Sequence, residues 1–158
     1  MTTEKKILSL IGIGSVILVI GAVFWLGKDS FTPVSEDQII TRTGLHWHPK
    51  LAIYLNGQKQ ELADGIGMGG TVHQRMHTHT EDFKEGVVHM EMQGLVTKDD
   101  TQLGKFFQIW GKDFNSRKIL DKEATAEGQI KMTVNGQGNT EFENYLMKEG
   151  DRIEIKYE

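Results

Sequence analysis

The residues of this 158-residue chain best suited to metal chemistry are its histidines, and all of them fall in one segment. The six are His46, His48, His73, His77, His79 and His89. Two pairs have the spacing H-x-H, and the last histidine begins an H-x-E motif. In an extended strand, residues i and i+2 point to the same face about 7 Å apart at the backbone, so two such imidazoles can converge on one ion. The predicted metal ligands are His46, His48, His77, His79, His89 and Glu91.

Two residues of the segment are interpreted differently from the paired histidines. His73 has no partner at i±2 and is interpreted as a loop residue. Glu91 is interpreted as a carboxylate that orients an imidazole more than as a direct ligand, because ligating histidines usually donate their other ring N–H to such a group. The same histidines also admit an interpretation without metal, as solvent-facing strand residues or as a switch that responds to low pH.

The available donor atoms restrict the ion. The chain has no cysteine, which excludes disulfides, thiolate zinc sites and blue-copper centres. Neutral imidazoles bind Zn²⁺, Cu²⁺, Ni²⁺ and Fe²⁺, and the Irving–Williams order favours copper among them. Thioethers suit Cu(I), and four methionines lie near the segment; alternation assigns Met90 and Met92 to core packing, so Met68 and Met76 are the better thioether candidates. We therefore expect a copper ion or, next, a zinc ion.

Period-two alternation predicts the strands that position these histidines. An alternating run over residues 51–55 ends at Asn56-Gly57, which is typical of a type I′ hairpin turn, and a return strand is expected over 58–62. A second alternating run follows Gly86 and extends to residue 92. Continued backward to residue 45, the first run places His46 and His48 opposite the core, and the second run places His89 and Glu91 there. The two ligand sets meet if the strands are neighbours, with residues 77–79 folding over that face from a loop.

The residues from 99 to 111 change to helical periodicity, with apolar side chains at i, i+3, i+4 and i+7. These side chains are Leu103, Phe106, Phe107 and Trp110. Asp100 or Thr101 can cap the start of the helix, and Gly111 suits its C-terminal end. The stripe is interpreted as packing against a sheet in preference to a cofactor slot.

Strand periodicity returns after the helix. Residues 130–134 alternate into a second Asn-Gly turn at Asn135-Gly136, and residues 152–157 alternate in a closing strand. The order of strands, one helix and further strands predicts an α+β domain: a small, mostly antiparallel or mixed β-sheet with one packed amphipathic helix.

An apolar stretch precedes this domain. Ile7 to Leu26 carries no charged residue and is long enough for a bilayer core of about 30 Å. It exceeds the usual apolar region of a cleavable signal peptide, and Phe24-Trp25-Leu26 replaces a small-residue cleavage site. Because Lys5 and Lys6 precede the stretch, we expect a cytoplasmic N-terminus and an extracytoplasmic C-terminal part. The expected organisation is a cytoplasmic stub and transmembrane anchor over 1–29, a tether over 30–43 and a histidine-rich α+β domain over 44–158.

Several motifs are distributed over nearly the whole predicted domain: His46-Trp47-His48-Pro49, Ile53 to Gly57, His77-Thr78-His79, Gly86 to Glu91, Leu103 to Gly111 and Gly150 to Ile155. Together they resemble an uncharacterised family of small, membrane-anchored extracytoplasmic proteins of bacteria and archaea. The resemblance implies no established activity. Similar proteins often carry a cysteine pair after the segment that matches Phe114 to Ser116, whereas residues 117–123 contain none here, so a redox role based on such a pair is not expected.

The sequence supports three functional hypotheses. The first is a single-pass, membrane-anchored, extracytoplasmic protein that binds copper or zinc for capture, sensing or delivery. The second is a metal-dependent enzyme with a three-histidine zinc site or a 2-His-1-carboxylate iron site, which requires an open coordination position in a pocket. The third is an interaction module of an envelope complex without a metal. The net charge of −4 disfavours nucleic acid as a partner.

Overall fold

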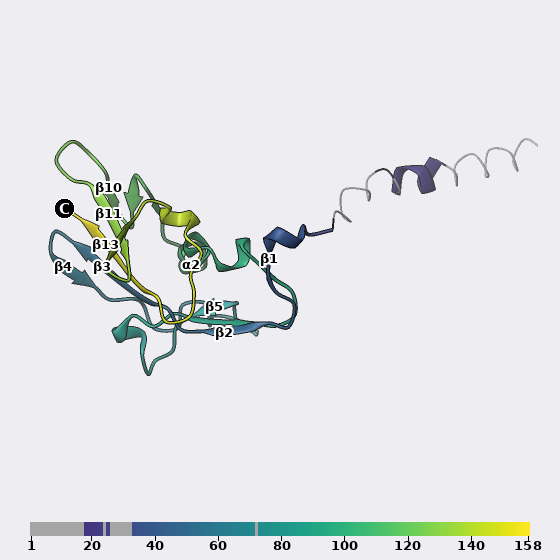
Figure 1. Ribbon diagram of the computed structural model, residues 1–158, viewed down its shortest axis with the longest axis horizontal. Coiled ribbons are helices and arrows are strands. Elements are labelled where there is room, and N and C mark those ends of the chain that lie inside the picture. The colour runs from purple at the N-terminus through teal and green to yellow at the C-terminus, as the bar shows by residue number, and fades with distance from the viewer. Residues whose placement is uncertain (1–17, 24, 26–32, 72) are drawn as a thin grey trace, which may run out of the picture. The chain divides into compact units, whose positions relative to one another are not determined.

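The computed structural model describes residues 18–23, 25, 33–71 and 73–158 (Figure 1). The expected anchor over residues 7–26 lies mostly outside this part of the chain; its described residues, 18–23 and 25, are helical and exposed. The described residues contain no helix whose length and apolar character would let it span a membrane. Glu36–Glu158 forms one compact unit. This unit contains every predicted metal ligand.

A five-stranded mixed sheet contains both of the predicted Asn-Gly hairpins. Its strands follow one another in the order β12 (Gln137–Asn139), β11 (Ile130–Val134), β13 (Arg152–Tyr157), β3 (Lys50–Leu55) and β4 (Gln58–Gln60). Asn56 and Gly57 have φ values of 51° and 79°, and Asn135-Gly136 is similar, as type I′ turns require. All neighbours are antiparallel except β13 and β3, which run parallel with Arg152 opposite Lys50. The predicted hairpins are therefore confirmed.

The histidines belong to a separate three-stranded antiparallel sheet. Its strands follow the order β2 (Leu45–Trp47), β6 (His89–Met92) and β5 (Met76–His77). His46 lies opposite Glu91, and His77 lies opposite His89. Pro49, which is buried, separates β2 from β3 and has no N–H to donate to a continuous ladder. The predicted strands are present, but they form two sheets, and His77 belongs to a strand that we expected to be a loop.

The remaining elements are short. They are β1 (Ile39–Thr41) paired with β7 (Val96–Thr97); the sheet of β10 (Lys122–Glu123), β9 (Lys118–Ile119) and β8 (Phe114–Asn115); and the 3₁₀ turns η2 (Glu36–Gln38), η3 (Phe83–Glu85), η4 (Asp99–Thr101) and η5 (Phe142–Asn144). Residues 36–43, which were predicted to belong to the tether, thus carry η2 and β1. The described domain is mostly β, with several small sheets and one short packed helix.

The packed helix is α2 (Leu103–Trp110), and its apolar stripe faces the core. Phe106 is fully buried, and α2 contacts β5 directly. Gly111 ends the helix with φ 70°, as predicted. The predicted cap is wrong: η4 intervenes, and the carboxylate of Asp100 accepts the backbone N–H of Thr97 at 2.9 Å instead. The stripe therefore serves packing and supports the strand that carries His77.

Gly44 controls how closely β2 approaches β6. Its φ is 92°, and an added Cβ would lie 2.3 Å from the carbonyl oxygen of Met92. Gly94 provides a matched control, because its φ is also positive at 71° but a Cβ there meets nothing within 4 Å. We expect Gly94→Ala to lower the free energy of unfolding by about 1–2 kcal/mol, because alanine is strained in this left-handed conformation. Gly44→Ala should lower it clearly more, because its Cβ would also clash with Met92. Urea denaturation of the full chain measures both losses, and equal losses would show that the close approach is unimportant.

Candidate metal centre

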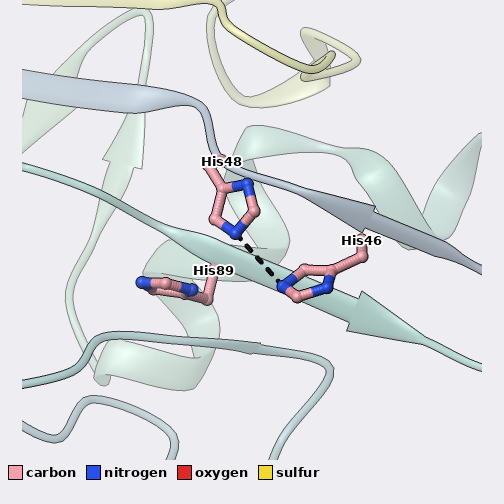
Figure 2. A group of neighbouring side chains, drawn as sticks. All are labelled: His46, His48 and His89. Atoms are coloured by element: carbon pink, nitrogen blue, oxygen red, sulfur yellow. Dashed lines mark hydrogen bonds between the residues drawn. The ribbon is translucent and has the colours of Figure 1, made fainter.

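The first histidine group forms where β2 lies beside β6. It consists of His46, His48 and His89, and one ring nitrogen of each lies within 4.8 Å of the others. The Nε2 atoms of His46 and His48 are 3.1 Å apart, and the rings of His48 and His89 are edge to face at 4.9 Å between centroids (Figure 2). His46 and His89 project from one face of the small sheet, as the alternation predicted, and His48 follows the end of β2. Three imidazoles therefore converge on one point.

The second group lies beside the first and is built from β5, the residues after it, and β6. It consists of His77, His79 and Glu91, again with one ligand atom of each within 4.8 Å of the others. The Nε2 atoms of His77 and His79 are 3.1 Å apart. His77 is buried, whereas Glu91 is exposed. The second H-x-H motif thus repeats the nitrogen spacing of the first on a different strand.

The nitrogen separation within each pair matches that of two ligands on one ion. Zinc–nitrogen bonds of about 2.0–2.1 Å at a tetrahedral angle place two ligand atoms about 3.3 Å apart. Both H-x-H pairs are close to this separation, at 3.1 Å. Each pair therefore presents two nitrogen atoms to one position with little rearrangement.

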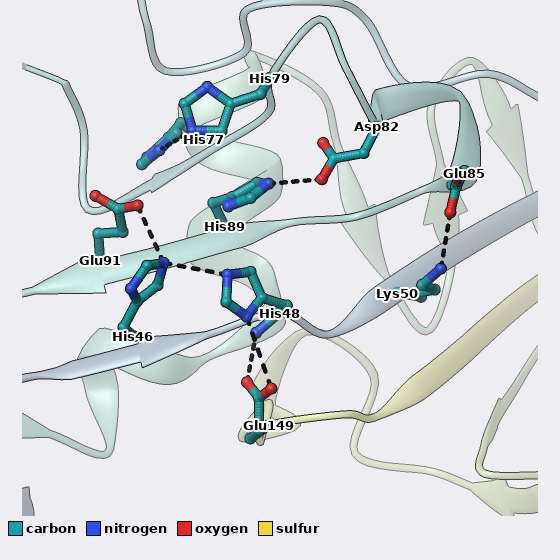
Figure 3. Close-up of polar contacts among 10 residues, drawn as sticks. All are labelled: His46, His48, Lys50, His77, His79, Asp82, Glu85, His89, Glu91 and Glu149. Atoms are coloured by element: carbon teal, nitrogen blue, oxygen red, sulfur yellow. Dashed lines mark hydrogen bonds and ion pairs between the residues drawn. The ribbon is translucent and has the colours of Figure 1, made fainter.

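The two groups are in contact with one another. The Oε1 atom of Glu91, in the second group, lies 3.2 Å from Nε2 of His46 in the first (Figure 3). The ring of His89 lies 4.4 Å from that of His79 and 5.7 Å from that of His77, between centroids. We call the six residues of the two groups the histidine cluster. All six ligands predicted from the sequence belong to it.

Hydrogen bonds outside the cluster orient two of its rings. The Nδ1–H of His77 donates to the carbonyl oxygen of Gln74 at 3.0 Å, which leaves Nε2 with its lone pair. The Nε2–H of His89 donates to Oδ2 of Asp82 at 2.9 Å, which leaves Nδ1 with its lone pair. Such contacts fix the tautomer and direction of a ligating imidazole. Each of these two rings is thereby limited to one ligand nitrogen.

Two carboxylates at the cluster were not found by sequence reasoning. Asp82 contacts His89, and its Oδ1 atom is, within the described part of the chain, the one buried side-chain nitrogen or oxygen without a hydrogen-bond partner. Glu149 accepts the backbone N–H of His48 through Oε2 at 2.6 Å, and its Oε1 lies 3.6 Å from His48 Nδ1. Asp82 has no histidine or carboxylate at i±2, and Glu149 has only Asp151 there, far along the sequence from the histidines.

Burial lowers the pKa of His77 below the ordinary imidazole value. The neighbouring rings of His79 and His89 act in the same direction, whereas the Gln74 carbonyl and the Glu91 carboxylate oppose it. His77 therefore stays neutral, the state required of a ligand, to lower pH than an exposed histidine. Because the unfolded chain takes up this proton first, the ion-free protein loses stability as the pH falls through about 6.5.

The remaining candidates belong to neither histidine group. His73 is an exposed loop residue, as expected; its ring lies 5.7 Å from that of His77, but it contributes no atom to either group. Met90 and Met92 are buried core residues, as expected. Met76 is buried in the same core, so its assignment as a thioether ligand is wrong: on β5 it points opposite to His77. Met68 is half-buried.

An open cavity of about 680 Å³ borders the cluster. His46, His77 and Glu91 all line it, so it touches both groups. Exogenous molecules can therefore approach the ligand atoms from this side.

No protein-family model, curated protein or solved structure matches the chain. Two histidine-rich groups capable of holding a metal ion are therefore the feature from which function is inferred.

Removing the carboxylate that orients His89 should weaken metal binding. Asp82→Ala leaves the His89 Nε2–H without its acceptor, and loss of such a partner typically lowers metal affinity about 10- to 100-fold. Glu81→Ala is the matched control, because this neighbouring acidic residue is exposed and belongs to neither group. Competition titrations of Zn²⁺ on both variants measure the effect. Equal affinities would show that Asp82 does not orient a ligand.

Proposed function

We propose that this protein binds a divalent transition-metal ion through the histidine cluster, with Cu²⁺ favoured and Zn²⁺ next. The supporting observation is the convergence of two H-x-H pairs, each with Nε2 atoms 3.1 Å apart, from separate segments of the chain. A hydrogen bond between two rings gives the same separation within one pair, but it does not explain why both pairs and His89 gather at one place on the sheet. The interaction-module hypothesis does not account for it.

The donor set favours a borderline divalent ion. The cluster offers imidazole nitrogen and carboxylate oxygen, which suit Cu²⁺ and Zn²⁺, and the Irving–Williams order ranks copper higher. The thioether argument for Cu(I) is weakened by the burial of Met76, Met90 and Met92 in the core. The preference for copper thus rests on the nitrogen ligands and concerns the oxidised ion.

The proposed role is capture, sensing or delivery of the ion at the outer face of a membrane. The uncharged run from Ile7 to Leu26 and the lysines before it support this location. The side chain of His46 is 61% exposed and that of His48 is 39% exposed. Ligands this accessible favour exchange of the ion with a partner over permanent structural use.

Metal affinity should fall steeply with pH. Protonated imidazole cannot coordinate, and an ordinary histidine with a pKa of about 6.5 is almost fully protonated at pH 5, so two such ligands together lose about 1000-fold in affinity. The lowered pKa of His77 makes that ligand resist protonation to a lower pH than the ordinary value. Titration of the full chain with Zn²⁺ at pH 7.5 and pH 5 measures this. Equal affinities at the two pH values would exclude histidine ligation.

The cavity favours a metal-dependent enzyme as the second candidate. It reaches both histidine groups, and an ion held there would supply Lewis-acid chemistry to a small molecule in the cavity. Assays of zinc-loaded and metal-free protein on chromogenic esters and phosphoesters test this function. Turnover that requires the ion and is lost on replacing His46 would support it, and binding without any turnover favours the first proposal.

A further inference from the structure

We infer that the histidine cluster holds two divalent ions side by side, with the carboxylate of Glu91 between them. The inference rests on the proposed function, because it concerns how the same residues share their ligands. Glu91 then acts as a direct ligand to both ions, a larger role than that of a carboxylate orienting one imidazole.

The number and placement of ligand atoms exceed what one ion uses. A structural zinc ion takes about four ligands, whereas the cluster supplies five imidazoles and a carboxylate. The two H-x-H pairs come from different strands, β2 and β5, which lie on opposite sides of β6. Each pair brings its own two Nε2 atoms to 3.1 Å. The sheet therefore creates two points of convergence, one on each side of the central strand.

His89 belongs to only one of these points. A neutral imidazole that donates one N–H has a single lone pair, and the Nε2–H of His89 is directed at Asp82. One ring nitrogen of His89 joins His46 and His48 in the first group. His89 therefore completes a three-nitrogen set and cannot link the two ions, although its ring packs against His79 at 4.4 Å between centroids.

Glu91 is placed to make that link. It is a member of the second group with His77 and His79, and its Oε1 lies 3.2 Å from Nε2 of His46 in the first. A carboxylate has two oxygens and can contact two ions, so one side chain on β6 serves both sides of the sheet. The first ion then has three nitrogens and one oxygen. The second has two nitrogens and one oxygen, and its group borders the cavity through His77 and Glu91.

Negative charge around the cluster reduces the repulsion between two adjacent cations. Glu91, Asp82 and Glu149 each lie against a different histidine of the first group, at 3.2, 2.9 and 3.6 Å between the closest ring nitrogen and oxygen. Three carboxylates carry more negative charge than is needed to balance one divalent ion bound by neutral imidazoles. The charge balance thus favours double occupancy.

Stoichiometry distinguishes one ion from two. Equilibrium dialysis of the full chain against Zn²⁺ alone, followed by elemental analysis, should give two equivalents for the unmodified protein and for the control His73→Ala. His48→Ala and His79→Ala should each retain one equivalent, because each removes a ligand from a different group. Glu91→Gln should weaken the second equivalent at least tenfold relative to the first.

Each other result has a definite meaning. One equivalent that both His48→Ala and His79→Ala abolish would indicate a single shared ion, which overturns the two-ion inference and leaves the proposed function standing. No bound zinc or copper in the unmodified protein would overturn both. Titration with Cu²⁺, followed by electron paramagnetic resonance, tests adjacency: the second equivalent should broaden the signal of the first, and two magnetically isolated signals would overturn the shared carboxylate.

Discussion

Replacing His46 and His48 together by alanine should abolish metal binding at the first histidine group. Zinc binding by a four-ligand site is worth about 10–16 kcal/mol, so each ligand contributes roughly 100- to 1000-fold in affinity. The double variant leaves His89 as the only imidazole of that group. Competition titrations with Zn²⁺ and Cu²⁺ on the full chain measure the loss. The remaining affinity then belongs to the second group.

His73→Ala is the control for this experiment, because it removes an exposed histidine of the same segment that belongs to neither group. Both variants should unfold like the unmodified protein in the absence of metal, within about 0.5 kcal/mol, because the replaced side chains are largely outside the core. A loss of affinity in His73→Ala as large as that of the double variant would show that the ions bind elsewhere in the histidine segment.

The part of the site that the sequence predicts is the part that depends on local periodicity. Alternation alone assigns His46 and Glu91 to the faces opposite their apolar neighbours, and the pairing of β2 with β6 places them directly across from one another. The same reasoning assigns Met90 and Met92 to the core, where both are buried. Local alternation is reliable here because a shift by one residue would bury the polar set.

Features that depend on distant chain segments were not predicted. β5 has only two residues, too few for alternation to be visible, so the buried position of His77 and the core position of Met76 became evident only in the fold. Glu149 reaches His48 across a separation of 101 residues because β13 runs parallel to β3. Sequence patterns indicate that both strands exist, but they do not show which strands are neighbours.

The helix illustrates the same limit at its start. Its apolar stripe is a repeating pattern and located α2 correctly, whereas the cap depends on single residues. Asp100 bonds to Thr97 and to Arg75, at 2.6 Å from the guanidinium, and the 3₁₀ turn η4 delays the helix to Leu103. A polar side chain near the start of a helix can form hydrogen bonds with several groups, and the tertiary structure determines which of these bonds forms.

Among the variants proposed for this protein, Phe106→Ala should cause the largest loss in the free energy of unfolding. The ring is fully buried at the centre of α2, where it lies 6.0 Å from Phe107 and 6.1 Å from Trp110 between centroids. Removing a buried phenylalanine costs about 3–5 kcal/mol, a large share of the 5–15 kcal/mol that stabilises a typical domain. Urea denaturation of the metal-free full chain measures this loss. Gln108→Ala, an exposed position on the same helix, should stay within about 0.5 kcal/mol of the unmodified protein.

The same variant connects the core to the metal centre. Because α2 contacts β5, which carries His77, the ligand geometry exists only while this helix is packed. An ion that binds the folded state alone adds about 2.7 kcal/mol of stability when its free concentration is 100 times Kd. Saturating Zn²⁺ should therefore return part of the stability that Phe106→Ala loses. If Zn²⁺ raises the urea midpoint of Gln108→Ala but not that of Phe106→Ala, the truncated core no longer holds β5 in place. If Zn²⁺ raises neither midpoint, the folded domain does not bind the ion.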